Sequence, residues 1–109
     1  MKDLKISTEL ISSVLVKETR HLTYDTIYVE DNYIIFSYEG EYQFEVNIYE
    51  FAFKCKEWAF KRELNLWTDY LGNCQIQDKE FQLLHDCYSD TEIETIIKVC
   101  EWLLSEVNK

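Results

Sequence analysis

The stretch Asn47–Arg62 reads NIYEFAFKCKEWAFKR and is the clearest structural signal in the sequence. Asn47 can accept a hydrogen bond from the first-turn amides of a helix. Glu50, three residues later, can reach back to the backbone N–H of Asn47. Asn47 and Glu50 together match the pattern of a capping box. The apolar residues behind the cap follow the spacing of one helix face, and they are Ile48, Phe51, Ala52, Cys55 and Ala59. We therefore predict a central amphipathic helix against which the neighbouring strands pack.

The residues before this helix predict a first helix and then a three-stranded antiparallel meander. Residues 7–17 carry an apolar helix face with Ser7 or Thr8 as the cap, although 14–16 would also fit a strand. Segments 24–29, 33–38 and 41–46 are rich in β-branched and aromatic residues, and residues 30–32 and 39–40 are predicted turns. The last segment alternates strictly, which predicts Tyr42, Phe44 and Val46 on one face and Glu41, Gln43 and Glu45 on the other.

The residues after the central helix predict more strands and a final helix. Residues 64–70 favour a strand, 71–73 a turn, 74–77 a returning strand, and 81–87 a further extended segment. Ser89 and Glu92 form a second capping-box pattern. The apolar stripe of this final helix consists of Ile93, Ile96, Ile97, Cys100, Leu104 and Val107. The order α-β-β-β-α-β-β(-β)-α predicts an α+β fold, an antiparallel sheet with a three-stranded N-terminal meander and helices packed on it.

Length and composition predict one folded domain over residues 1–109. The chain has 109 residues, of which 47% are hydrophobic and 16% aromatic, so it can bury a core. The four cysteines could pair as disulfides in a secreted protein, but no secretory signal precedes them, which favours reduced thiols in a cytosol. No apolar run approaches the roughly 20 residues of a membrane span, so no membrane partner is predicted.

The charge distribution is the most informative functional feature. The net charge of −10 disfavours direct binding to nucleic acid, because such binding depends mainly on cations that face phosphates. Between His21 and Phe53 there are seven acids and no Lys or Arg, the acids being Asp25, Glu30, Asp31, Glu39, Glu41, Glu45 and Glu50. Rows of carboxylates on neighbouring strands repel one another. The alternative reading is that they are the ordinary polar half of amphipathic strands and keep the domain soluble.

If the meander alternates as predicted, most of these acids share its outer face with Thr26, Ser37 and several tyrosines. Such a face suits a partner protein with a basic groove that normally holds phosphates, since tyrosines supply flat contact area. The predicted partner-binding residues are Tyr28, Glu30, Asp31, Tyr33, Glu39, Glu41, Gln43 and Glu45.

Catalytic and metal-binding patterns are weak. His85-Asp86-Cys87, with Cys74 thirteen positions before Cys87, is the one local candidate for a metal site or a thiolate–imidazole pair. It lacks a C-x₂-C pair and an orienting third group. The three tryptophans, Trp58, Trp67 and Trp102, could stack on a ligand or serve as core and interface anchors. We predict no enzyme, no cofactor and no metal, and a small Cys/His enzyme is the third alternative.

The segments Asn47–Ala59 and Ser89–Trp102 resemble two helices of small proteins from bacteriophages and integrated mobile elements. The resemblance covers the second half of the chain, rests on caps and on Cys and Trp positions, and carries over no functional residue. The small size, strong acidity and tyrosine-rich face are similar to those of anti-CRISPR and other anti-defence proteins, many of which occupy a nucleic-acid channel.

This resemblance implies a non-enzymatic inhibitor that imitates nucleic acid in the basic groove of a CRISPR effector or similar protein. It also implies that the protein acts in the cytoplasm of a host bacterial cell. The alternative is a homodimerising interaction or assembly module, without mimicry, that associates through exposed aromatics or a sheet edge.

Overall fold

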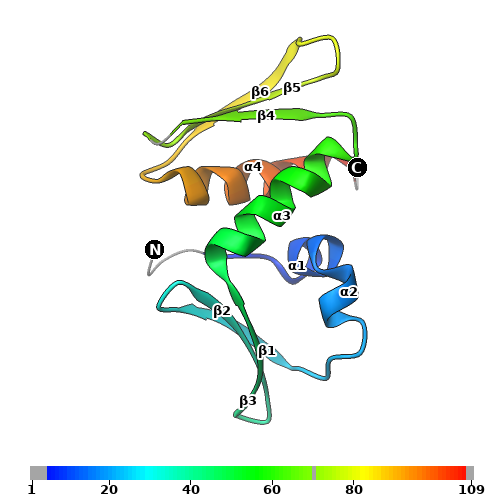
Figure 1. Cartoon of the computed structure of the whole chain (residues 1–109), viewed down its shortest axis with the longest axis vertical. Coiled ribbons are helices and arrows are strands. Elements are labelled where there is room, and N and C mark those ends of the chain that lie inside the picture. Colours follow the sequence, from blue (N-terminus) through cyan, green and yellow to red (C-terminus); the bar gives the residue numbers. More distant parts are fainter. Residues whose placement is uncertain (1–4, 70, 108–109) are drawn as a thin grey trace.

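The computed structural model describes residues 5–69 and 71–107, with side chains described up to residue 106. It has two three-stranded antiparallel sheets with the helices between them (Figure 1). The elements are α1 (Thr8–Val14), α2 (Val16–Thr19), β1 (Thr26–Glu30), β2 (Tyr33–Tyr38), β3 (Glu41–Asn47), α3 (Ile48–Phe60), β4 (Asn65–Thr68), β5 (Asn73–Gln77), β6 (Leu83–Tyr88) and α4 (Glu92–Val107). The predicted α+β class and element order are confirmed, including the strand from the segment 81–87.

The two sheets lie at opposite ends of an elongated molecule of 45 × 26 × 22 Å. We call β1-β2-β3 the first sheet and β4-β5-β6 the second sheet. α3 and α4 pack against each other between them, and α1 and α2 lie beside α3 toward the first sheet (Figure 1). The strands therefore do not form one continuous sheet, and the helices supply the common core.

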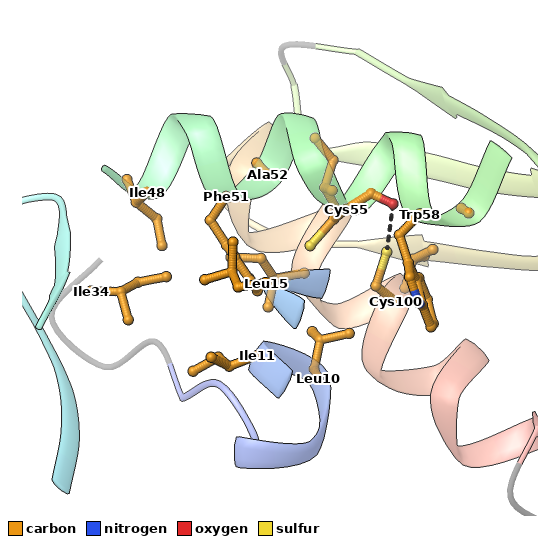
Figure 2. Packing of buried hydrophobic residues seen from close by; sticks show 14 of the residues in the cluster. Leu10, Ile11, Leu15, Ile34, Ile48, Phe51, Ala52, Cys55, Trp58 and Cys100 are labelled. Atoms are coloured by element: carbon orange, nitrogen blue, oxygen red, sulfur yellow. Dashed lines mark hydrogen bonds between the residues drawn. The ribbon is translucent and has the colours of Figure 1, made fainter. Parts of the chain in front are cut away.

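α3 begins as the sequence predicts. Asn47 is its N-cap, and its side-chain oxygen accepts a hydrogen bond from Tyr49 N at 2.8 Å. Among the described residues, Glu50 makes no hydrogen bond back to Asn47, so the second half of the capping box is not formed. The five apolar residues of the predicted stripe are all buried, and Trp58 adds to them (Figure 2).

The first sheet is built from two tight hairpins. Asp31 and Asn32 have φ values of 49° and 68°, and Glu39 and Gly40 have 52° and 80°, as two-residue type I′ turns require. The inner face buries Ile34, Phe36 and Val46 against the helices.

An irregularity in the pairing of β2 with β3 corrects one prediction about β3. Phe36 pairs with Phe44, but the next residue, Ser37, pairs with Tyr42, so Gln43 is an extra residue in β3. Strict alternation placed Tyr42 beside Phe44 on the buried face, and this is wrong. The bulge turns Tyr42 to the exposed side, where its hydroxyl lies 3.4 Å from Glu45 Oε1.

The predicted helix over residues 7–17 is interrupted. Ser7 caps α1, since its hydroxyl accepts a hydrogen bond from Leu10 N at 3.1 Å. Leu15 leaves the helical region with φ −104° and ψ 44°, and α2 then begins at Val16. The side chain of Leu15, at the break between α1 and α2, is fully buried in the core.

The start of α4 differs from the predicted capping box. Thr91 is the residue whose hydroxyl accepts from the helix, at 3.2 Å from Glu94 N. Ser89 instead donates its backbone N–H to Gly72 O at 3.0 Å, and its hydroxyl has no hydrogen-bond partner among the described residues. The predicted stripe of α4 faces the core, with Val99 and Leu103 buried beside it. The side chain of Val107 lies outside the described residues.

Candidate functional site

The outer face of the first sheet carries most of the predicted partner-binding residues. Register defines this face as three rows across the strands, Glu30–Tyr33–Asn47, Tyr28–Ile35–Glu45 and Thr26–Ser37–Tyr42. β1, β2 and β3 contain no Lys, Arg or His, so the face has acidic groups and no basic ones. Side chains alternate across a strand, and burial of the other face by the helices leaves most of this one to solvent, with Ile35 half-buried and Ser37 buried.

Four of the eight predicted residues lie together on this face. Tyr28 and Tyr33 are 43% and 39% exposed, and Glu30 and Glu45 are exposed beside them. Tyr42 joins them with 60% exposure, because of the bulge. The set is a compact surface of three phenol rings and two carboxylates.

The other four predicted residues are exposed but are not gathered with these. Asp31 lies in the β1–β2 turn, which is tied to the start of α3 by a 2.8 Å hydrogen bond from Ile48 N to Asn32 O. Glu39 and Glu41 lie at the opposite end of β2, and Gln43 occupies the bulge. A six-residue strand spans about 20 Å, so the predicted residues form an extended surface and not a point-like site.

Two residues of this region have roles that the sequence did not indicate. Asp25 uses one carboxylate oxygen to accept from Thr26 Oγ1 and the other to accept from Glu39 N, each at 3.1 Å, so it organises the β2–β3 turn. Ile35 lies half-buried in the centre of the outer face. The apolar run Ile34-Ile35-Phe36 was the available signal for Ile35, since alternation alone would place a polar residue there.

The acids of the first sheet are not neutralised by the lysines of the helices. Lys54 pairs with Glu18 at 3.0 Å, Lys56 with Glu92 at 3.4 Å, and Lys79 with Glu63 at 3.7 Å. Within the described part of the chain, none of the seven acids between His21 and Phe53 forms an ion pair. Their negative potential therefore reaches solvent.

Local electrostatics act on two side chains of these regions in opposite directions. Partial desolvation, followed by the charge and hydrogen bond of Glu45, raises the pKa of Tyr42. Burial alone would raise the pKa of Glu18, but the hydrogen bond and charge of Lys54 outweigh it and hold that pKa low. Lys54 is thereby committed to Glu18 and not to the acidic face.

The cysteines are positioned as core residues. Cys55, Cys74 and Cys100 are buried, and the Cys100 thiol lies 3.7 Å from Cys55 O (Figure 2). Burial raises the pKa of the Cys74 thiol to about 12 and that of Cys55 well above its ordinary value. All four cysteines are free thiols. Since the thiolate is the nucleophile and the metal ligand, these two protonated thiols are unsuited to either role at neutral pH.

The His85–Cys87 candidate is directed into the protein. Cys87 pairs with the buried Cys74 across β5 and β6, and His85 pairs with the buried Ile76, so both share the face toward α4. The His85 ring stacks on Trp102 with centroids 4.2 Å apart and planes inclined by 4°. Among the described residues no three His, Cys, Asp or Glu side chains are grouped so that they could hold a metal ion.

The tryptophans occupy three different environments. Trp58 is buried, with the Arg62 guanidinium 4.0 Å from its ring centroid, and Trp102 stacks on His85. Trp67 is 56% exposed on β4. In the described part of the chain no helix is both long and apolar enough to cross a membrane.

Fold and surface together define a small α+β protein with one acidic, tyrosine-bearing sheet face. Comparison with protein-family models, with curated proteins and with solved structures finds no match for the chain. The resemblance to proteins of phages and mobile elements therefore stays a prediction from sequence.

Proposed function

We propose that the protein is a non-enzymatic binding protein whose outer first-sheet face occupies the basic, nucleic-acid-binding groove of a protein partner. The observation that carries this proposal is the exposed group of Tyr28, Tyr33, Glu30 and Glu45 on a face without a basic side chain. Its carboxylates take the place of phosphates, and nucleic acid itself is not bound.

Two physical properties of the face support this role. Unpaired carboxylates on one surface steer a positively charged partner toward that surface and raise the association rate. Tyrosines supply large, rigid contact area at low cost in conformational entropy, which makes them frequent binding anchors. Repulsion among the acids also falls when cations of a partner approach them.

The particular form that we propose is an anti-defence inhibitor of the anti-CRISPR type, acting on a CRISPR effector in the host cytoplasm. This step rests on the sequence resemblance, on the small size and on the acidity of the chain. The same face would fit other proteins that bind nucleic acid in a basic groove, because the complementary chemistry is the same.

Binding to purified CRISPR effectors, followed over a salt series and in competition with short nucleic-acid duplexes, tests the proposal. We expect the affinity to fall steeply with salt, since ions screen contacts between opposite charges, and we expect nucleic acid to displace the protein. Glu30→Lys and Glu45→Lys should weaken binding mainly through the association rate. Glu80→Lys makes the same charge change in the β5–β6 loop, at the other end of the molecule, and should have little effect.

Affinity that is unchanged from low to high salt, or simultaneous binding of protein and nucleic acid, would remove the mimicry proposal. The second candidate function is a homodimerising assembly module, which the exposed aromatic residues of α3 favour. Light scattering favours the second candidate where it finds a stable dimer that covers the first-sheet face, since such a dimer leaves no surface for a basic partner. A dimer through α3 leaves that face free, and the salt and competition assays then decide.

A further inference from the structure

α3 has a second apolar stripe, on the side turned away from the core. Tyr49, Phe53 and Phe60 are 52%, 64% and 71% exposed. Their spacing of four and seven residues puts them on one line along the helix. Isolated exposed apolar residues are ordinary, but a row of three aromatics on one helix face marks an interaction surface.

This aromatic stripe runs into a groove at the end of α3. The groove has a volume of about 410 Å³ and lies between the last turns of the helix and β4, with Phe60, Leu64, Leu66 and Trp67 among its lining residues. Trp67 is itself 56% exposed. Lys56, Glu57 and Lys61 also line the groove, so stripe and groove form an apolar surface edged by charged side chains.

A row of alternating charges lies beside the aromatic stripe. Along α3 and its C-cap these are Glu50, Lys54, Glu57 and Lys61. In chain order the signs of the four charges are negative, positive, negative, positive. Read in the opposite direction they are positive, negative, positive, negative, so every position changes sign. Glu50 and Lys61 share the same midpoint as Lys54 and Glu57, between residues 55 and 56. A second copy of the helix, placed antiparallel, would therefore set each acid opposite a lysine.

Within one chain these charges do not satisfy each other. Pairs four residues apart on a helix, such as Glu50 with Lys54 and Glu57 with Lys61, often form ion pairs that support the helix. Here Lys54 already pairs with Glu18 of α2, at 3.0 Å. In a dimer it would share its charge between Glu18 and the partner's Glu57, and the contacts between Glu50 and Lys61 would be the new ion pairs. In the residues that the structure describes, Glu50, Glu57 and Lys61 form no ion pair.

We propose that two copies of this chain associate through the exposed faces of α3, packed antiparallel about a two-fold axis. An interface of this symmetry must be self-complementary, and the charge row meets that condition. Phe53 and Phe60 have their midpoint between residues 56 and 57, one residue away from the midpoint of the charge row. Phe53 of each protomer then lies over the partner's groove beside Phe60 and Trp67.

The area of this surface sets the expected strength. A fully buried aromatic side chain covers about 150–250 Å², so four that are more than half exposed offer about 400 Å² per protomer. A standard interface buries about 800 Å² per partner. The flanking charged side chains must contribute the rest, and we expect a dimer that dissociates on dilution.

Sedimentation and light scattering over a concentration series test the dimer. Glu50→Lys replaces two attractive contacts by two repulsive ones, and we expect the dissociation constant to rise by about tenfold. Phe53→Ser should reduce association further by removing an apolar anchor. Both positions are exposed, so circular dichroism and thermal unfolding should show an unchanged fold.

The decisive variant is Glu50→Lys combined with Lys61→Glu, which should restore the wild-type dissociation constant. Within one helix these residues are eleven positions apart, about 16 Å, so they cannot compensate each other inside a protomer. The matched control is Glu45→Lys on β3, which should leave dimerisation unchanged while it weakens binding to a basic partner.

Three outcomes would overturn the α3 interface: a wild-type monomer at every concentration, a dimer insensitive to Phe53→Ser, or failure of the double swap to restore association. The experiment is independent of the proposed function, since it involves no partner protein. Capture of a different helix by the monomer, without self-association, would also count against it.

Discussion

Gly72 illustrates how one residue fixes the contact between a turn and a helix. It has a φ of 94°, and a Cβ at this position would overlap the carbonyl oxygen of Ser89. Its own carbonyl accepts hydrogen bonds from Ser89 N and from the Thr95 hydroxyl. The turn between β4 and β5 is therefore held against the start of α4 by contacts that leave no room for a side chain.

We predict that Gly72→Ala lowers the free energy of unfolding by about 3 kcal/mol, because backbone strain and overlap with Ser89 add. Gly40→Ala is the matched control, since Gly40 also has positive φ (80°) but has nothing near its Cβ position. It should cost about 1 kcal/mol from strain alone. Urea unfolding of both variants measures the difference, and equal losses would contradict the close contact at Gly72.

At the scale of elements, α4 shows that one capping signal can be replaced by another a few residues away. Ser89 with Glu92 matches the capping-box pattern, yet the backbone N–H of Ser89 donates to Gly72 O in the turn between β4 and β5. Thr91 then takes the capping position. Glu92 accepts hydrogen bonds from the Thr68 hydroxyl at 2.7 Å and from Lys56 Nζ at 3.4 Å, which ties α4 to β4 and α3.

Thr91→Ala and Ser89→Ala should therefore differ in stability. We predict a loss of about 1 kcal/mol for Thr91→Ala, the usual cost of removing a helix cap. Ser89→Ala should be neutral or slightly stabilising, because its buried hydroxyl has no partner among the described residues. Thermal unfolding of the two variants checks this prediction. A larger loss of stability for Ser89→Ala than for Thr91→Ala would show that Ser89, and not Thr91, caps α4.

At the scale of the whole molecule, both sheet regions are acidic, but the ion pairs within the described residues lie away from the first sheet. The net charge is −10, and the acids of the first sheet have no ion-pair partner within the described residues. Among the described residues, the ion pairs join α3 to α2, α3 to α4, and the α3–β4 loop to the β5–β6 loop. Self-repulsion among the acids of the first sheet and its hairpins is thus not offset by an ion pair.

We predict that sodium chloride stabilises the isolated protein between very low and physiological ionic strength, since the Debye length falls to about 8 Å at the latter. In Glu30→Gln with Glu45→Gln the salt-induced gain in unfolding free energy should be smaller. The control Glu63→Gln should not reduce the gain, because Glu63 is paired with Lys79 and its removal takes away an attraction and not a repulsion. Stability that is independent of salt would show that repulsion in the first sheet is negligible.

Much of the fold was predictable from sequence because the signals involved are local. The buried stripe Ile48–Ala59 repeats with the period of a helix, and both hairpin turns carry residues that tolerate positive φ. The exposure of Tyr28 and Tyr33 also follows from alternation within single strands. These features depend on residues a few positions apart, which is the range over which side-chain periodicity acts.

The features that the sequence did not predict depend on contacts between residues distant in the chain. Strand alternation could not reveal the bulge at Gln43, which depends on pairing with β2 and which moves Tyr42 to the exposed face. The choice of Thr91 over Ser89 as the cap depends on a turn seventeen residues earlier in the chain, at Gly72. The sequence by itself determined the elements and the inward and outward residues of most of them. Only the tertiary structure decided that the strands divide into two sheets on opposite sides of the helices, because strand partners and helix contacts are fixed by the packing of residues distant in sequence.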